Sequence, residues 1–272
     1  MIARYSKPRC VRLAEKIAVA AVNPFQANAA THLMATKAIK IISSRPRWMP
    51  VLLTLVALLI VFASGCQTAP PNSLATHNSS IWRNAIAAYE ANDQTNPPPK
   101  NGIVFVGSSS ILKWKTLAAD FPDLPVINRG FGGSQLADAV NFADRIVIKY
   151  QPREVVVYAG GNDLNAGKSP EMVYGDFVAL MRQLHAGLPH AQLAFISSAP
   201  NLARWSQVEK VKRLNLLAEN YCRHHDIFFI NVFPLMLGTD GKPKPDIYVA
   251  DGLHMNAKGY AIWRAAVAPY LK

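Results

Sequence analysis

The sequence predicts a single α/β domain, in which a five-stranded parallel sheet is covered by helices on both faces. Short apolar segments alternate five times with amphipathic segments between residues 103 and 267. One of them, Glu154-Val-Val-Val-Tyr158, shows no alternation of polar and apolar residues, which is typical of a strand buried on both faces. Because parallel crossovers are right-handed, we expect three layers and the flavodoxin-like strand order 2-1-3-4-5, with its switch point between strands one and three.

Composition and charge exclude some functions. The chain has 272 residues, of which half are hydrophobic, so it can build a sizeable core. Its net charge is +12, but residues 1–65 hold nine basic residues and one acid, and the remaining chain holds 20 basic and 16 acidic residues. Because the basicity lies mainly in the first segment, we expect no nucleic-acid partner. Three widely spaced cysteines form neither a disulfide framework nor a zinc site.

Residues 1–65 read as a leader. The apolar run 51–63 is preceded by basic residues and is too short for a membrane span, which needs roughly 20 residues. It ends in Ala63-Ser64-Gly65-Cys66, which resembles the bacterial lipobox and implies lipidation of Cys66. Residues 1–33 precede this complete signal as a doubtful extension, and Met34 would serve as a start.

That resemblance implies a lipid anchor in the cell envelope. Gln67 follows the cysteine in place of the aspartate that retains lipoproteins in the inner membrane, which favours the outer membrane in a Gram-negative organism. Residues 66–80 are polar and rich in proline, so we expect a flexible tether between the anchor and a domain over 81–272.

The elements of the domain follow in order. The spacing of Ile81, Ala85, Ala88 and Tyr89 predicts a first helix that ends near Asn92. Ser169 and Asn256 are expected to cap the third long helix and the last helix. The predicted strands cover residues 103–106, 126–128, 154–158, 193–196 and 227–230.

Glycine-containing turns follow the first three predicted strands and should meet at one edge of the sheet. They bring together Ser109, Gly133 and Asn162. A fourth loop, Asp251-Gly-Leu-His254, precedes the last helix. This set fits acyl transfer, because a serine nucleophile needs a base such as His254, and the imidazole needs an acceptor such as Asp251. The N–H groups of Ser109 and Gly133 and the amide of Asn162 would then bind the oxyanion.

The four blocks resemble those of the SGNH hydrolases, also called GDSL lipases and esterases. The blocks are Gly107-Ser-Ser109, Gly133 within Asn-Arg-Gly-Phe-Gly-Gly, Gly160-Gly-Asn162-Asp163, and Asp251-Gly-Leu-His254, and the likeness extends over about residues 100–272. The resemblance implies a triad of Ser109, Asp251 and His254, with Gly133 and Asn162 in the oxyanion hole. The first block departs from the usual Gly-Asp-Ser-Leu, since Ser108 replaces the aspartate and Ser110 the leucine.

Other polar residues have plainer interpretations. His224 and His225 are adjacent, so their side chains point apart, and we expect a solvated helix end and no metal. Asp163 is expected to tie its turn together. Arg204 could either contact substrate or form a surface salt bridge.

We therefore expect a lipid-anchored serine esterase that needs no metal or organic cofactor. Its ester substrate stays open among acylated carbohydrates, lysophospholipids and short-chain esters. Two alternatives stay open as well: an O-acetyltransferase that uses the same triad on an envelope glycan, and a catalytically inactive glycan-binding module.

Overall fold

The computed structural model describes residues 69–272. The predicted leader over 1–65 and the predicted lipidation site Cys66 lie outside the described residues. Among the helices of residues 69–272, none combines the length and the apolar character that crossing a membrane requires.

A five-stranded sheet in the order 2-1-3-4-5 forms the centre of the domain, and all of its paired strands are parallel. This confirms the predicted architecture. Strand β1 lies between β2 and β3, so the chain reverses its winding direction between β1 and β3, where such sheets place their ligands. The strands are β1 (Ile103–Gly107), β2 (Val126–Gly130), β3 (Glu154–Tyr158), β4 (Gln192–Ile196) and β5 (Phe228–Ile230).

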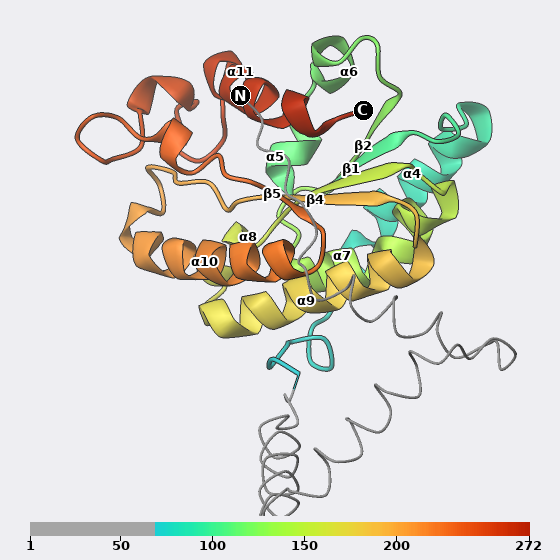
Figure 1. The fold of residues 1–272 in the computed structure, drawn as a ribbon, viewed down its shortest axis with the longest axis horizontal. Coiled ribbons are helices and arrows are strands. Elements are labelled where there is room, and N and C mark those ends of the chain that lie inside the picture. The colour runs from blue at the N-terminus through green and yellow to red at the C-terminus, as the bar shows by residue number, and fades with distance from the viewer. Residues whose placement is uncertain (1–68) are drawn as a thin grey trace, which may run out of the picture. The chain divides into compact units, whose positions relative to one another are not determined.

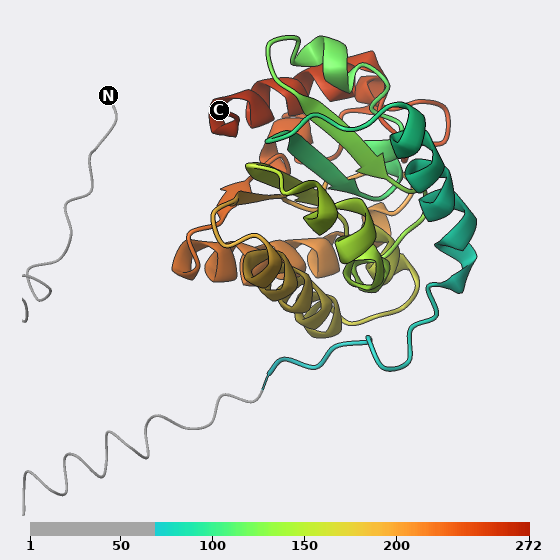
Figure 2. The ribbon, with the colours of Figure 1, turned by 90° about the vertical axis from the view of Figure 1, so that its right-hand side faces the viewer.

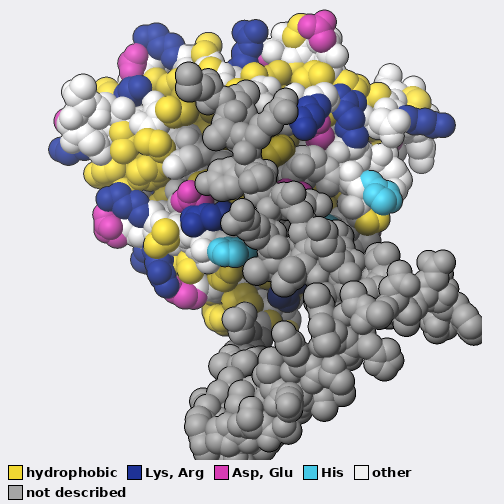
Figure 3. Space-filling view, viewed as in Figure 1, with side chains coloured by type: hydrophobic (Ala, Val, Ile, Leu, Met, Phe, Trp, Pro, Cys, Tyr) yellow, Lys and Arg dark blue, Asp and Glu magenta, His cyan; other side chains and the backbone are white. Residues whose placement is uncertain are grey.

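Helices cover both faces of the sheet (Figures 1 and 2). Alternate residues of β1 supply two apolar clusters: Val104 and Val106 pack with α4, α7, α9 and α10, whereas Ile103 and Phe105 pack with α5, α6 and α11. The helices are α4 (Arg83–Thr95), α5 (Ser109–Leu112), α6 (Leu117–Asp120), α7 (Leu136–Ile146), α8 (Gly161–Asn165), α9 (Pro170–Gly187), α10 (Val208–His224) and α11 (Ala257–Val267). On the face shown in Figure 3, Lys and Arg side chains are scattered among acidic and apolar ones.

Capping side chains begin two helices as predicted. The Ser169 hydroxyl accepts a hydrogen bond from the Met172 N–H at the start of α9, and the Asn256 side chain accepts from Lys258 and Gly259 at the start of α11. Each cap satisfies backbone donors that have no partner within the first helical turn.

The first helix begins later than predicted and packs through a different face. Ile81 is 73% exposed, whereas Ile86 is fully buried. Trp82 and Tyr89 pack beside Ile86, so the packed face is rotated by about one residue from the predicted one. The inward face therefore carries the large side chains of Ile86 and Tyr89, and the small alanines Ala85 and Ala88 face outward.

Residues 73–79 pack against the domain, which differs from the free tether predicted over 66–80. The backbone N–H and the hydroxyl of Ser73 both donate to the buried Asp176 carboxylate on α9, each at 2.7 Å. His77 Nε2 lies 2.7 Å from Asp138 on α7. At Gly175 a side chain would clash with the Pro71 carbonyl oxygen at 1.8 Å, so the segment crosses α9 closely. Polar composition alone did not indicate these buried partners.

Candidate active site

Ser109 lies directly beyond the carboxyl end of β1, at the first position of the short helix α5. The turn depends on Gly107, whose φ is +151° and where a Cβ would lie 1.9 Å from the Tyr158 carbonyl oxygen of β3. The Ser108 N–H donates to that same oxygen at 3.1 Å. The tight approach of β1 to β3 therefore fixes the position of Ser109 at the switch point of the sheet.

His254 and Asp251 come from the loop that precedes α11, and the structure brings both to Ser109. His254 Nε2 lies 2.9 Å from Ser109 Oγ, and His254 Nδ1 lies 2.6 Å from Asp251 Oδ2. In the neutral tautomer that this arrangement favours, Nδ1–H donates to the carboxylate and Nε2 accepts from the serine hydroxyl. The geometry joins three side chains that are up to 145 residues apart in sequence.

Backbone N–H groups of the same loop hold the Asp251 carboxylate in place. Asp251 Oδ1 accepts from the N–H groups of Leu253 and His254, both at 2.9 Å. The hydrogen bond from the His254 ring, followed by these two backbone bonds, holds the pKa of the Asp251 carboxyl well below its usual range. The carboxylate is therefore ionised at neutral pH and keeps the imidazole in one orientation.

The three turns that follow β1, β2 and β3 are tied to one another. In the β2 turn, the Phe131 N–H donates to the Gly107 carbonyl at 2.9 Å. Asn162 Nδ2, on α8, donates to the Ser134 carbonyl at 2.9 Å. A Cβ placed on Gly132 would lie 4.0 Å from the Ser109 Cβ, so the second turn passes beside the serine. Residues 131–134 thus lie between Ser109 and Asn162.

N–H donors that could bind an oxyanion lie at the same edge of the sheet as Ser109. Within residues 69–272, the N–H groups of Ser109 and Gly133 make no hydrogen bond. Gly133 has φ +84°, a conformation that favours glycine. The Asn162 amide uses one N–H for Ser134 and keeps the second for a ligand. Sequence reasoning placed these three donors together, and the turns that carry them do meet at this edge.

Arg204 holds the other end of the Asn162 amide. Its Nη1 donates to Asn162 Oδ1 at 3.0 Å and to the Gly161 carbonyl at 3.2 Å. Burial lowers the pKa of this guanidinium from its usual value. Within the described residues Arg204 forms no salt bridge, in contrast to one of the two roles weighed from the sequence, and it binds the Asn162 side chain at the site instead. The residue types alone carry no signal for this pairing, which depends on the loop after β4.

Asp163 stabilises its turn, as predicted. It is fully buried, accepts from the Leu136 N–H and pairs with Lys168, whose Nζ lies 3.0 Å from Oδ1. Lys168 also lies 2.9 Å from Asp176 Oδ2.

His224 and His225, which are adjacent in the sequence, lie at the end of α10. The Nδ1 atom of each ring forms a hydrogen bond with a backbone carbonyl of the same helix, in agreement with the predicted helix end.

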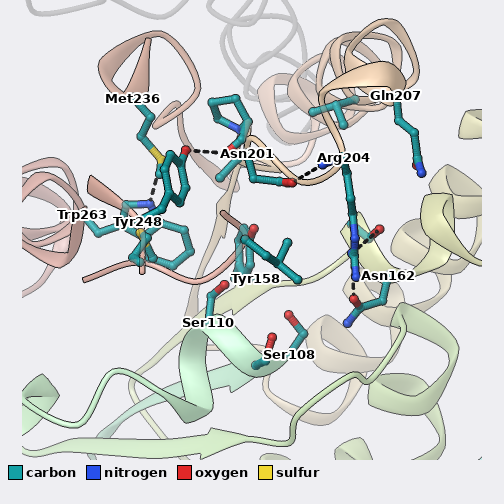
Figure 4. A pocket seen from close by; sticks show the side chains of 17 residues that line it. Ser108, Ser110, Tyr158, Asn162, Asn201, Arg204, Gln207, Met236, Tyr248 and Trp263 are labelled. Carbon is teal, nitrogen blue, oxygen red and sulfur yellow. Dashed lines mark hydrogen bonds between the residues drawn. The ribbon is translucent and has the colours of Figure 1, made fainter. Parts of the chain in front are cut away.

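A cavity lies beside Ser109 (Figure 4). Its sides near the serine are formed by Ser108, Ser110 and Tyr158, and Asn162 and Arg204 lie at one end. The other end is formed by residues that the sequence analysis did not place at the site, because only tertiary packing brings them there: Met236, Tyr248 and Trp263.

With this geometry in place, comparison with known proteins is informative. The model of the GDSL-like lipase/acylhydrolase family matches residues 105–262, more than half of the chain. The chain belongs to the GDSL-like lipase/acylhydrolase family. Membership of this family supports a hydrolase that acts on ester bonds.

Solved structures of GDSL-type proteins share the fold. A GDSL-like lipase from Bacteroides thetaiotaomicron superposes with a TM-score of 0.60 at 22% identity, over 68% of this chain and 96% of that one. A mutant of an acetyl-xylooligosaccharide esterase from Geobacillus gives a TM-score of 0.53 at 12% identity, over 63% of this chain and 94% of that one. No curated protein matches the sequence significantly.

Proposed function

We propose that this GDSL-family protein is a serine esterase in which Ser109 attacks the carbonyl of a carboxylic ester. The observation that supports it best is the chain of short contacts from Ser109 through His254 to Asp251, 2.9 Å and 2.6 Å long. His254 takes the proton from Ser109 as the hydroxyl oxygen bonds to the carbonyl carbon. Asp251 stabilises the imidazolium that forms.

The tetrahedral intermediate would be stabilised by fixed donors. The N–H groups of Ser109 and Gly133 and the amide of Asn162 would bind its oxyanion, and losing one such donor typically costs about 100- to 1,000-fold in rate. Collapse breaks the bond to the alcohol, whose oxygen takes the proton from His254 Nε2, and leaves an acyl-Ser109 ester. Water, deprotonated by His254, then releases the acid and restores the serine.

The test is hydrolysis of nitrophenyl acetate by the wild type and by Ser109→Ala. We expect kcat to fall by at least about 1,000-fold in the variant, since the nucleophile is lost. Ser108→Ala and Ser110→Ala serve as matched controls and should keep most of the activity. Undiminished hydrolysis by Ser109→Ala would overturn the mechanism.

Product analysis separates hydrolysis from transfer. An O-acetyltransferase would pass the acyl group from Ser109 to a glycan hydroxyl, and an inactive glycan-binding module would release no acid. Acetate released at the same rate with and without a glycan acceptor would support the esterase.

We further propose that the protein is anchored in the cell envelope through a lipid on Cys66, and in the outer membrane, facing the periplasm, if the cell is Gram-negative. The proposal is supported by Ala63-Ser64-Gly65-Cys66 after an apolar run of 13 residues. Incorporation of labelled palmitate into the wild type but not into Cys66→Ser is the expected result. Equal labelling of both would contradict it.

A further inference from the structure

We infer that the cavity beside Ser109 is an acyl pocket that accepts an acetyl group and excludes longer chains, so that the substrates are acetyl esters. The inference rests on the proposed function, because it assigns a direction to the ester on Ser109. It names Met236, Tyr248 and Trp263 as the residues that set the limit.

The position of His254 fixes which part of the ester enters the cavity. The leaving oxygen must take its proton from His254 Nε2, so the alcohol lies on the side of that ring. The cavity is formed by Ser108, Ser110 and Tyr158 around the serine, and from the loop before α11 it is lined by Leu253 and Met255 but not by His254. The acyl carbon chain, which points away from the leaving oxygen, therefore enters the cavity.

The cavity is small. Its volume is about 40 Å³. Pockets that bury drug-sized ligands have volumes of roughly 300 to 1,000 Å³, so this cavity suits a short acyl chain and not a long one.

The far wall is fixed in place. Met236 and Trp263 are both fully buried, and the Trp263 indole N–H donates to the Met236 sulfur at 3.3 Å. The Tyr248 hydroxyl donates to the Pro200 carbonyl at 2.7 Å. These bonds appear in Figure 4. Moving any of these side chains aside would break one of these bonds, which costs free energy.

Tyr158 closes the cavity from the sheet side. Its ring meets the Trp263 ring edge-on, with centroids 4.6 Å apart. This contact fixes the Tyr158 side of the cavity against α11. Selectivity is therefore expected for the acyl chain.

The test is a chain-length series of nitrophenyl acetate, propionate, butyrate and hexanoate. One methylene in a tight apolar pocket changes kcat/KM by about 10- to 200-fold. We expect kcat/KM to fall by at least about 10-fold from acetate to butyrate, and hexanoate to be cleaved more slowly still. Hexanoate cleaved as fast as acetate would overturn the inference and leave the esterase proposal intact, whereas no hydrolysis of any ester would defeat the esterase proposal.

Met236→Ala enlarges the pocket and should raise the ratio of butyrate to acetate hydrolysis by about 10-fold or more. The matched control is Met181→Ala, which removes the same atoms from an equally buried methionine in the other apolar cluster. Its ratio should not change. A ratio of two rates measured on one preparation does not depend on how much enzyme is folded. Met236→Val, a smaller truncation, should shift the ratio in the same direction, and an unchanged ratio in both Met236 variants would overturn the assignment.

Discussion

Asp251 and Asp163 each stand beside a proposed catalytic side chain, His254 and Asn162, yet their surroundings differ. The Asp251 side chain is 44% exposed, whereas that of Asp163 is fully buried. Hydrogen bonds from His254 and its loop lower the pKa of Asp251. Burial raises the pKa of Asp163, against the opposing charge of Lys168.

The two carboxylates therefore have different roles. Asp251 holds its charge without a cation, through short hydrogen bonds, one of which comes from the imidazole that it orients. Asp163 needs Lys168 beside it because no water reaches it, and it receives the Leu136 N–H at the start of α7. Changes at the exposed turn, which carries Asp251, should therefore affect the chemistry. Changes at the buried turn, which carries Asp163, should affect folding.

The largest expected effect is on catalysis, from Asp251→Asn. An amide at this position can donate to Nδ1 and stabilise the wrong imidazole tautomer, so kcat should fall by about 10,000-fold. The unfolding temperature should change little because the side chain is exposed. Asp246→Asn is the matched control, since Asp246 pairs only with the exposed Lys258. A loss of activity no greater in Asp251→Asn than in the control would break the comparison.

Lys168→Met should lower stability while sparing the chemistry. It leaves Asp163 and Asp176 buried without their cation, which costs about 3 to 5 kcal/mol in the free energy of unfolding. Urea unfolding measures this loss, and kcat per folded molecule should stay within about 10-fold. Lys212→Met, which breaks an exposed pair with Glu209, should cost no more than about 1 kcal/mol.

The stability loss in Lys168→Met should depend on pH. A carboxyl whose pKa is raised by folding stabilises the protein below its unfolded pKa, and that contribution is lost as the pH rises through the folded value. Without Lys168 the pKa of Asp163 rises further. The free energy of unfolding of the variant should therefore be closest to that of the wild type near pH 4. It should be furthest below the wild-type value above neutral pH. A loss that is the same at every pH would argue against a buried carboxylate as its cause.

Arg204→Met should have the smallest effect and should sharpen the comparison at the buried turn. Without Arg204, the Asn162 amide keeps only its bond to Ser134 and can rotate away from the oxyanion. We expect kcat to fall by about 10- to 100-fold, less than for loss of the whole donor, with KM nearly unchanged. Arg213→Met, on the same side of the sheet and paired with the exposed Glu171, is the control. An unchanged kcat would show that Ser134 alone orients the amide.

The sequence predicted the sheet well because its strands are continuous apolar runs between turns. It placed Ser109, Gly133, Asn162 and the Asp251–His254 loop at one edge because parallel strands end on the same side. Their roles in catalysis stay predictions until the variants are measured.

Features that depend on long-range packing were not predictable. The pairing of Arg204 with Asn162 needs the fold of the loop after β4, and the buried partner of Ser73, Asp176, lies 103 residues away. The inward face of α4 carries Ile86, which the spacing of Ile81, Ala85 and Ala88 did not indicate. Charge pairing across the fold, unlike strand periodicity, leaves no local pattern in the sequence.

The central claim is that Ser109 is the nucleophile, and covalent labelling tests it most directly. The protein would be treated with a nitrophenyl alkylphosphonate ester and digested for mass spectrometry. An activated serine oxygen bonds to the phosphorus of this reagent as nitrophenolate leaves. We predict a single adduct on Ser109 in the wild type and none in Ser109→Ala. An adduct on Ser108 or Ser110, or labelling of Ser109→Ala at the rate of the wild type, would contradict the claim.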